Sequence, residues 1–281
     1  SASAPFGAPL PRPSRSCWSF RSPWSYLATR RLRDWEAQYD LIVNFRPVYP
    51  IAVRSPEFFH SVQPQWFSYF MTDVFRVAEF LALPFVWPRP DPVVQIVDEH
   101  GRRQTGEVQP YIDRLTRLGA LAEELGAGLA FADEVSALIW GGTTGWDQGE
   151  HLAQAAHRAG LDLAGMDQRI IHEADRLDAV IAANQVAHEQ AGHWGVPTCV
   201  YQGVPFFGQD RLDVLLWRFE QRDGLGIRLG ALHGAVGHVG GRAALTVHGV
   251  DVGAFRDQVA DHLHVAAGGG VVQRGAAFVV D

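Results

Sequence analysis

The sequence predicts an α/β protein in which a long helical segment interrupts a small core that contains strands. The chain opens with a strand–helix–strand pattern, and residues 57–191 then carry mostly helical patterns. The stretch before residue 222 returns to two short strands and a helix. Alternation of strand and helix patterns is typical of α/β folds.

The opening unit is predicted from signals that follow one another along the chain. A short strand is expected at Ser16–Phe20. Pro23 suits the first turn of a helix, where its missing N–H group is not needed, and an apolar stripe extends that helix to about Tyr39. The β-rich run Leu41–Phe45 follows. These elements predict a βαβ unit with parallel strands.

The middle of the chain is predicted to be helical, apart from glycine-containing breaks and a proline-rich loop at Pro84–Pro92. Apolar residues at helical spacing predict helices at Gln65–Phe80, Val108–Leu125, Asp133–Trp140, Gln148–Ala159 and Asp167–Gln190. After these, Thr198–Gln202 and Val204–Phe207 are expected to pair as a hairpin through Gly203. Asp210–Gln221 is expected to form the last helix.

These elements divide the chain into parts. Residues 1–15, rich in Pro, Ser and Ala, are expected to be a flexible leader. The core is assigned to residues 16–56 and 192–221, the helical insertion to residues 57–191, and a C-terminal extension of unknown role to residues 222–281. Within the extension, Thr246–Val250 is expected to be a strand and Ala254–His262 a helix. The pattern His262-x-His264 is too weak to predict a metal site.

Composition narrows the classes of function. The formal net charge of −7 argues against a nucleic-acid partner, which needs a basic face. All 24 basic residues are Arg, which excludes lysine Schiff-base chemistry. No apolar run reaches the roughly 18 residues of a membrane helix. Two cysteines without a Cys-x-x-Cys motif suit a reducing compartment, and the leader does not resemble a signal peptide. A cytoplasmic protein without a membrane partner is therefore expected.

Ser22-Pro23-Trp24-Ser25 is the most informative motif for chemistry. It lies at the predicted strand-to-helix turn and looks like a redox Cys-x-x-Cys with oxygen in place of both sulfur atoms. A hydroxyl cannot form a disulfide, but it can donate a hydrogen bond to the thiolate of another molecule. A helix N-terminus favours an anion, so a thiol held there would be pushed toward thiolate. The alternatives are that Ser22 is only a helix N-cap and that Ser25 is bonded to local backbone.

Two distant stretches, Gly192–Thr198 and Pro205–Arg211, form a joint pattern with Phe20–Ala28. On these residues the chain resembles the 2-hydroxychromene-2-carboxylate isomerase family, which is closely related to kappa-class glutathione transferases and more distantly to DsbA-type oxidoreductases. The resemblance spans roughly residues 16–221. It implies a thioredoxin-like fold with a large all-helical insertion domain, glutathione as the cofactor, and a homodimer.

The resemblance also assigns further residues to the site. Val196-Pro197 is expected to be a cis-proline turn, with the Val196 N–H and C=O groups pairing with the cysteinyl backbone of glutathione as an added strand would. Gln209 and Asp210 are expected to hold the γ-glutamyl end, with a plain N-cap as the alternative for Asp210. His193 is left outside the catalytic set, because a packing role explains it as well as a proton shuttle does.

Other residues carry narrower expectations. Cys17 and Cys199 are predicted to be free and buried. If Ser22 faces Pro197, this fold puts Phe20 opposite Cys199, so Cys17 lies about three residues further along, roughly 10 Å away and beyond the ~7 Å limit for a disulfide. Arg21 lies close to where the family usually has an acidic residue, and either assists an anion or points to solvent. Arg54 and Arg76 are both candidates to pair with a substrate carboxylate.

The expected function is that of a glutathione-dependent isomerase acting on a small molecule, a conjugated aromatic oxo-acid. Ser22 would hold a thiolate that adds to an electron-poor carbon and leaves after rotation about the former double bond. A kappa-like glutathione transferase and a redox-inactive DsbA-like module that binds extended peptides remain alternatives. A thiol–disulfide oxidoreductase is disfavoured, because neither Ser22 nor Ser25 can carry the electrons.

Overall fold

The computed structural model describes residues 12–39, 41–97, 99, 103–223, 238–239 and 242–243. The chain divides into two units between Ile227 and Arg228. The second unit contains the short antiparallel pair β7 (His238–Val239) and β8 (Arg242–Ala243). The strand and helix expected between residues 246 and 262, the His262-x-His264 pattern and residues 1–11 of the leader lie outside the described residues.

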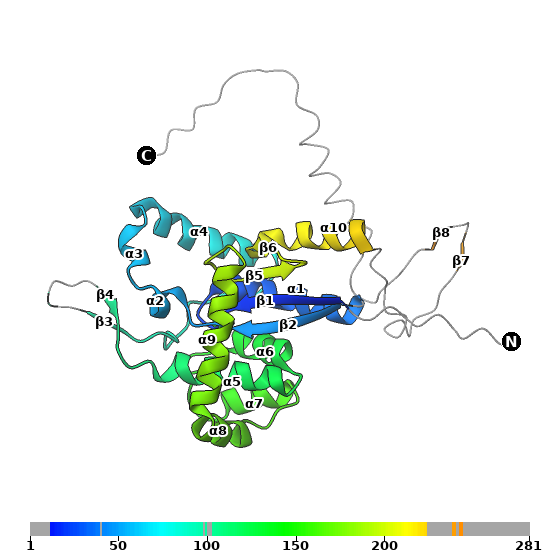
Figure 1. The fold of residues 1–281 in the computed structure, drawn as a ribbon. Coiled ribbons are helices and arrows are strands. Elements are labelled where there is room, and N and C mark those ends of the chain that lie inside the picture. Colours follow the sequence, from blue (N-terminus) through cyan, green and yellow to red (C-terminus); the bar gives the residue numbers. More distant parts are fainter. Residues whose placement is uncertain are drawn as a thin grey trace, which may run out of the picture. The chain divides into compact units, whose positions relative to one another are not determined.

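A four-stranded mixed sheet forms the core of the first unit (Figure 1). β1 (Arg12–Trp18) runs parallel to β2 (Leu41–Pro47), and α1 (Pro23–Gln38) connects them, so the predicted βαβ unit is confirmed. On its other side β1 pairs antiparallel with β5 (Thr198–Tyr201), which pairs antiparallel with β6 (Val204–Phe207). The strand order is therefore β2-β1-β5-β6.

The first strand begins earlier than the sequence suggested. β1 runs from Arg12 to Trp18, so it begins before the predicted strand Ser16–Phe20 and ends before Phe20. Its first residues lie in the stretch that was expected to belong to the leader, residues 1–15. Pairing with β2 runs from Arg12 opposite Leu41 to Trp18 opposite Pro47. Because a backbone ladder satisfies N–H and C=O groups whatever the side chains are, it extends through a stretch that the polar sequence alone marked as irregular.

The insertion is helical except for one short hairpin. α2 (Ile51–Arg54) lies just before the insertion. The helices of the insertion are α3 (Phe58–Ser61), α4 (Pro64–Phe80), α5 (Pro110–Glu124), α6 (Gly128–Trp140), α7 (His151–Arg158), α8 (Leu163–His172) and α9 (Ala174–Gln190). The hairpin, β3 (Gln95–Val97) and β4 (Arg103–Thr105), was not predicted, because three-residue strands are too short to show alternation. In Figure 1, α5–α8 gather on the β2 side of the sheet. None of the helices in the described residues is long and apolar enough to cross a membrane.

The helix predicted at Asp167–Gln190 is wrong in one respect, because Glu173 interrupts it. The break lets α8 pack against α5 and α7, while α9 packs against α5 and β2. The Glu173 carboxylate pairs with Arg169 on α8 and with Arg176 on α9. An apolar pattern that continues across a change of direction gives no sign of the break.

The C-terminal part of the core follows the prediction closely. The β5–β6 hairpin turns through Gln202 and Gly203, which both have positive φ values, as a tight two-residue turn requires. The predicted last helix begins instead with a 3-10 turn at Gln209–Arg211 and continues as α10 (Leu212–Asp223).

Buried aromatic side chains hold the C-terminal end of β1, which leads into the turn at Ser22. Trp18 is fully buried, and its ring centroid lies 4.5 Å from that of Phe20 and 5.3 Å from that of Phe45. The indole N–H of Trp140 donates to the Phe20 carbonyl at 3.1 Å. A Cβ atom at Gly119 would come within 2.9 Å of the Phe20 ring, so this glycine allows α5 to lie close to the sheet.

The outer edge of β2 is closed by carboxylates. The Val43 N–H group donates to Glu36 Oε1 at 2.7 Å, and the Phe45 N–H group donates to Glu123 Oε1 at 3.0 Å. Burial is the main reason why the pKa of Glu123 is raised to about 7. Edge N–H groups that are already bonded do not offer a free ladder to another strand.

Candidate functional site

Ser22 lies at the N-terminus of α1, where local sequence makes a capped helix start. Its backbone is extended, Pro23 takes the first helical position, and the Ser25 N–H group donates to Ser22 Oγ at 3.2 Å. The first turn contains no acidic residue, so no carboxylate of the helix itself compensates the positive end of its dipole. Ser22 is thus an N-cap, and its half-buried side chain still reaches solvent.

The structure brings the two distant motifs together at one point. Ser22 Oγ donates to the Val196 carbonyl oxygen at 3.2 Å. The Val196–Pro197 peptide bond is cis, as expected. The strand-to-helix turn and the cis-proline turn therefore meet, although 174 positions separate Ser22 from Val196.

Some hydrogen-bonding groups at the start of α1 have partners within the protein, and one does not. The Ser22 hydroxyl accepts from Ser25 N–H and donates to Val196, so both of its roles are taken. Among the described residues, nothing accepts a hydrogen bond from the Trp24 N–H group. Ser25 is fully buried, and its Oγ accepts from the Ser19 N–H group at 3.5 Å. Local bonding accounts for Ser25, whereas the Trp24 N–H group has no acceptor in the described chain.

Gly195, which precedes Val196, is bonded through both of its backbone groups. Its carbonyl accepts from His188 Nε2 at 2.8 Å and from Thr198 Oγ1 at 2.6 Å. Its N–H group donates to His193 Nδ1 at 2.9 Å. A Cβ atom at Gly195 would collide with the Phe207 ring. The turn is therefore set by its neighbours on α9, on β5 and within the loop itself.

The two histidines of this region serve the loop. Because a carbonyl only accepts, the His188 proton is on Nε2, and its buried Nδ1 has no partner among the residues that the structure describes. Burial, with the Arg54 charge second, lowers the pKa of His188 to about 4. His193 stacks on Phe207 with centroids 3.9 Å apart, and burial lowers its pKa as well. A packing role for His193 accounts for these contacts, while His188 had no signal in the sequence beyond a polar position on a helix.

A row of aromatic rings runs beside the meeting point and links its two sides. The ring contacts, with centroids between 4.7 and 5.9 Å apart, join Trp24 to Phe70, Phe70 to Trp66, Trp66 to Phe58 and Phe58 to Trp194. We call these five residues the aromatic row. It starts two residues after Ser22 and ends two residues before Val196. Trp194 is 49% exposed and the other members are half-buried.

Gln209 and Asp210 follow the hairpin that the cis-proline turn begins. The Gly208 N–H group donates to the Pro197 carbonyl at 2.9 Å, which brings the start of the 3-10 turn close to that proline. Gln209 is buried and Asp210 is exposed, with its carboxylate paired to Arg211 at 2.8 Å. Among the described residues, no hydrogen bond joins either residue to Ser22 or Val196.

Arg21 fits neither of its two expected roles. Its guanidinium makes a two-pronged contact with Asp91, at 3.0 and 2.8 Å, and lies 4.9 Å from the centre of the Trp87 ring. The Arg21 charge is thus neutralised by a side chain of the Pro84–Pro92 loop. No local pattern around Arg21 indicates a partner that far along the chain.

Both cysteines are free and buried, as predicted, but the reasoning about their register was wrong. Cys199 lies opposite Ser16, and Cys17 lies opposite Thr198. Neighbouring positions of a ladder point to opposite faces of the sheet, so the two thiols are kept apart by direction. Burial is the main reason why the pKa of Cys17 rises to about 11 and that of Cys199 to about 12.

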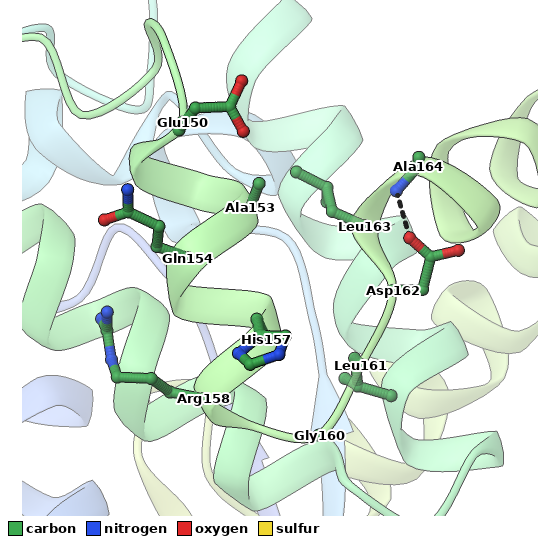
Figure 2. Close-up of a pocket in the computed structure, with 10 residues that line it drawn as sticks. All are labelled: Glu150, Ala153, Gln154, His157, Arg158, Gly160, Leu161, Asp162, Leu163 and Ala164. Atoms are coloured by element: carbon green, nitrogen blue, oxygen red, sulfur yellow. Dashed lines mark hydrogen bonds between the residues drawn. The ribbon is translucent and has the colours of Figure 1, made fainter.

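One open hollow lies in the helical insertion, between α7 and α8. Figure 2 shows its lining, which includes Gln154, His157, Leu161 and Asp162. None of the predicted site residues lines it. In the described part of the chain, no three His, Cys, Asp or Glu side chains are grouped so as to hold a metal ion.

The parallel βαβ unit, the antiparallel hairpin after a cis-proline and the long insertion define a thioredoxin-like protein. The family model of the DSBA-like thioredoxin domain matches residues 17–220, and the chain belongs to this family. No curated protein sequence matches the chain significantly.

Two solved structures with TM-scores above 0.5 agree on the fold. A 2-hydroxychromene-2-carboxylate isomerase is 20% identical, with a TM-score of 0.52 over 74% of this chain and 95% of that one. A probable DsbA oxidoreductase from Streptomyces coelicolor is 17% identical, with a TM-score of 0.51 over 77% and 99%. The cytosolic disulfide reductase DsbM from Pseudomonas aeruginosa, solved with GSH, is 16% identical, with a TM-score of 0.46 over 73% and 99%. At these identities the likeness concerns the fold alone.

Proposed function

We propose that this protein holds the sulfur of glutathione at Ser22 and isomerises a conjugated aromatic oxo-acid. The observation that carries the proposal is the 3.2 Å contact between Ser22 Oγ and the Val196 carbonyl at the start of α1. A hydroxyl, a helix N-terminus and a backbone carbonyl meet there, and these are the groups that suit a thiolate on a peptide backbone. When bound, glutathione would supply the thiolate that adds to the conjugated carbon and leaves after bond rotation.

The chain's own thiols support a sulfur of external origin. Cys17 and Cys199 are buried, with pKa values raised to about 11 and 12. Thiols with such values stay protonated near neutral pH, and the thiolate is the nucleophile. Ser22 and Ser25 occupy the positions of a redox pair without being able to carry its electrons.

Ser22 would act by exchanging its hydrogen-bond acceptor. Its hydroxyl has one proton to donate, and that proton is directed at the Val196 carbonyl. A ligand backbone N–H group that donates to Val196 in its place would release the hydroxyl, which could then donate to the ligand's sulfur. The Trp24 N–H group offers a second donor at the same helix end.

The aromatic row supports a planar, apolar substrate. Half-buried rings beside a polar catalytic point resemble the usual lining of small-molecule sites, which is mostly apolar with few polar groups. A conjugated aromatic acid could stack on or against such rings. The proposed place of the substrate is therefore beside Trp24 and Trp194 rather than in the hollow between α7 and α8.

Gln209 and Asp210 remain the proposed residues for the γ-glutamyl end of glutathione. The Asp210 carboxylate is exposed and pairs with Arg211. An exposed ion pair of this kind is weak, so the ligand's ammonium group could displace Arg211. This part of the proposal is supported by the position of both residues after Pro197.

Calorimetric titration with glutathione tests the proposal directly. The native chain should bind glutathione, and Ser22→Ala should weaken binding roughly 10-fold or more, since a hydrogen bond to a charged group contributes about 1.5–3 kcal/mol. Ser25→Ala is the matched control, because its hydroxyl is buried in local bonds, and it should bind like the native chain. No binding by the native chain at millimolar glutathione would refute the proposal.

Turnover distinguishes the proposed isomerase from the two alternatives. An isomerase converts the oxo-acid with glutathione present and leaves the glutathione concentration unchanged. Consumption of glutathione would instead identify a kappa-like transferase, and binding of extended peptides without glutathione affinity would identify a DsbA-like peptide module. A homodimer in the cytoplasm is part of the proposal, and light scattering together with cell fractionation tests it.

A further inference from the structure

Arg54, the last residue of α2, makes no ion pair with a carboxylate of the residues that the structure describes. Its Nε donates to the Tyr49 carbonyl at 2.8 Å, and its Nη2 donates to the Trp194 carbonyl at 2.5 Å. Both acceptors are uncharged. Among the described residues, no carboxylate lies within ion-pair distance of Arg54, whereas Arg21, Arg114 and Arg117 each hold one.

The Arg54 guanidinium is partly withdrawn from water and still has free donors. Burial lowers its pKa, and the nearby charge of Glu189 opposes that effect, but a guanidinium remains protonated in proteins. It has five N–H donors, of which two are used by the bonds above. Its Nη1 makes no hydrogen bond within the described chain, and it is not fully buried. That end therefore faces solvent.

Arg54 adjoins the proposed thiol site through Trp194. Trp194 precedes Val196 by two residues, which span at most about 7 Å of chain, and Val196 accepts the Ser22 hydroxyl. Trp194 and Phe58, the last two members of the aromatic row, are in ring contact beside it. Arg54, two rings of the aromatic row and the Ser22 turn thus all adjoin the short stretch from Trp194 to Val196.

We propose that Arg54 is the residue that binds a ligand carboxylate in this site. The inference rests on the proposed function, in which Ser22 holds the sulfur of glutathione. It names Arg54 as the group in the same site that recognises an anion. The carboxylate belongs either to the glycyl end of glutathione or to the oxo-acid substrate. Arg76, the other candidate, is exposed on α4 and makes no ion pair with the described residues.

Paired ligands that differ only in the carboxylate test this inference on the full chain. One pair is cinnamate and cinnamamide, and the other is glutathione and its glycyl ethyl ester, each titrated by calorimetry. The native chain should prefer the acid of at least one pair, and Arg54→Gln should reduce that preference roughly 10- to 100-fold, as expected for loss of a charge-assisted bond. The pair that responds identifies the source of the carboxylate.

Two further variants separate anion binding from a purely structural role. Arg54→Lys keeps a cation and should retain much of the acid preference, even if loss of the bonds to Tyr49 and Trp194 lowers the melting temperature. Arg76→Gln should leave the preference unchanged. A native chain without acid preference in either pair, or an Arg54→Gln variant with unchanged preference, would overturn the inference. If glutathione fails to bind while the cinnamate preference depends on Arg54, the proposed function fails and the inference stands.

Discussion

The two sides of the Ser22–Val196 contact are built in different ways. The Ser22 side is local: Ser22 N–H donates to Ser19, and the N–H groups of Ser25 and Tyr26 donate back to Ser22. The Val196 side is assembled from several separate elements, namely α9 through His188, α2 through Arg54 and β6 through the Phe207 ring. One half of the site therefore depends on a few consecutive residues, and the other depends on tertiary packing.

This difference determines how each side should respond to change. Substitution of a local cap removes the bonds of that cap and little more. Substitution in an assembled loop leaves buried groups without partners, and such groups carry the larger penalties. The Val196 side should therefore be the more sensitive of the two to mutation and to pH.

The largest expected effect is that of Gly195→Ala. The added Cβ atom would overlap the Phe207 ring, which is itself stacked on His193. Overpacking of this kind typically destabilises by about 1–3 kcal/mol, and we expect the upper part of that range in urea unfolding. Gly106→Ala is the control, because its Cβ atom would meet only ordinary contacts of 3.4 Å with Val94. Equal stability of the two variants would contradict the idea of a tightly assembled loop.

A pH-dependent loss of stability should be traceable to His188. Its pKa is about 4 in the folded protein and about 6.5 in an unfolded chain. Between these values the unfolded state binds more protons, so stability is complete above pH 6.5 and falls as the pH drops toward 4. The fall should reach about 3 kcal/mol, because each difference of one between the folded and unfolded pKa values corresponds to about 1.4 kcal/mol. Denaturant unfolding at a series of pH values measures it.

The His188→Gln variant isolates this contribution. A glutamine side-chain N–H group can still donate to Gly195 but does not titrate, so the fall below pH 6.5 should flatten. Glu123 acts in the opposite sense, because its raised pKa of about 7 makes the folded state bind more protons and lowers stability as the pH rises through 7. The difference between native and His188→Gln profiles, rather than either profile alone, is therefore decisive. An unchanged profile in the variant would show that His188 is not the titrating group.

The same contrast explains which parts of the molecule were predictable from sequence. The Ser22 side was predictable, because Pro23 after a small polar residue is a local signature of a helix start. The cis-proline turn was also identified, but only through resemblance. Arg54 and Asp91 act through partners far along the chain, Trp194 and Arg21, and no local pattern marks such pairs. His188 bonds to Gly195, only seven residues away, but across a loop whose path the sequence does not show.

Element boundaries failed for related reasons. β1 extends to Arg12 because β2 offers a full ladder, which cannot be deduced from the strand itself. The break at Glu173 follows from packing against different neighbours, and the periodicity of a helix does not record it. The cysteine register was wrong for the same reason, since the pairing of Ser16 with Cys199 depends on how the hairpin meets β1.

A smaller effect is expected on the local side of the site. Ser22→Ala removes the N-cap bond from Ser25 and the bond to Val196, and loss of an N-cap typically costs about 1 kcal/mol. Because the change is confined to one helix start, the pH profile of the His188 contribution should be the same as in the native chain. Urea unfolding at pH 7 and pH 5 measures both quantities. A loss as large as that of Gly195→Ala would mean that the two sides are not separable.

The smallest effect should come from the exposed end of the site. Arg211 pairs with Asp210, and both side chains are more than half exposed, at 57% and 59%. Exposed pairs contribute about 0–1 kcal/mol, so Arg211→Ala should change the free energy of unfolding by less than about 0.5 kcal/mol. The same variant removes the partner with which a ligand ammonium would compete for Asp210, so glutathione affinity should stay equal or rise. A fall in affinity would show that Arg211, rather than Asp210, contacts the ligand, and the unchanged stability would distinguish that result from damage to the fold.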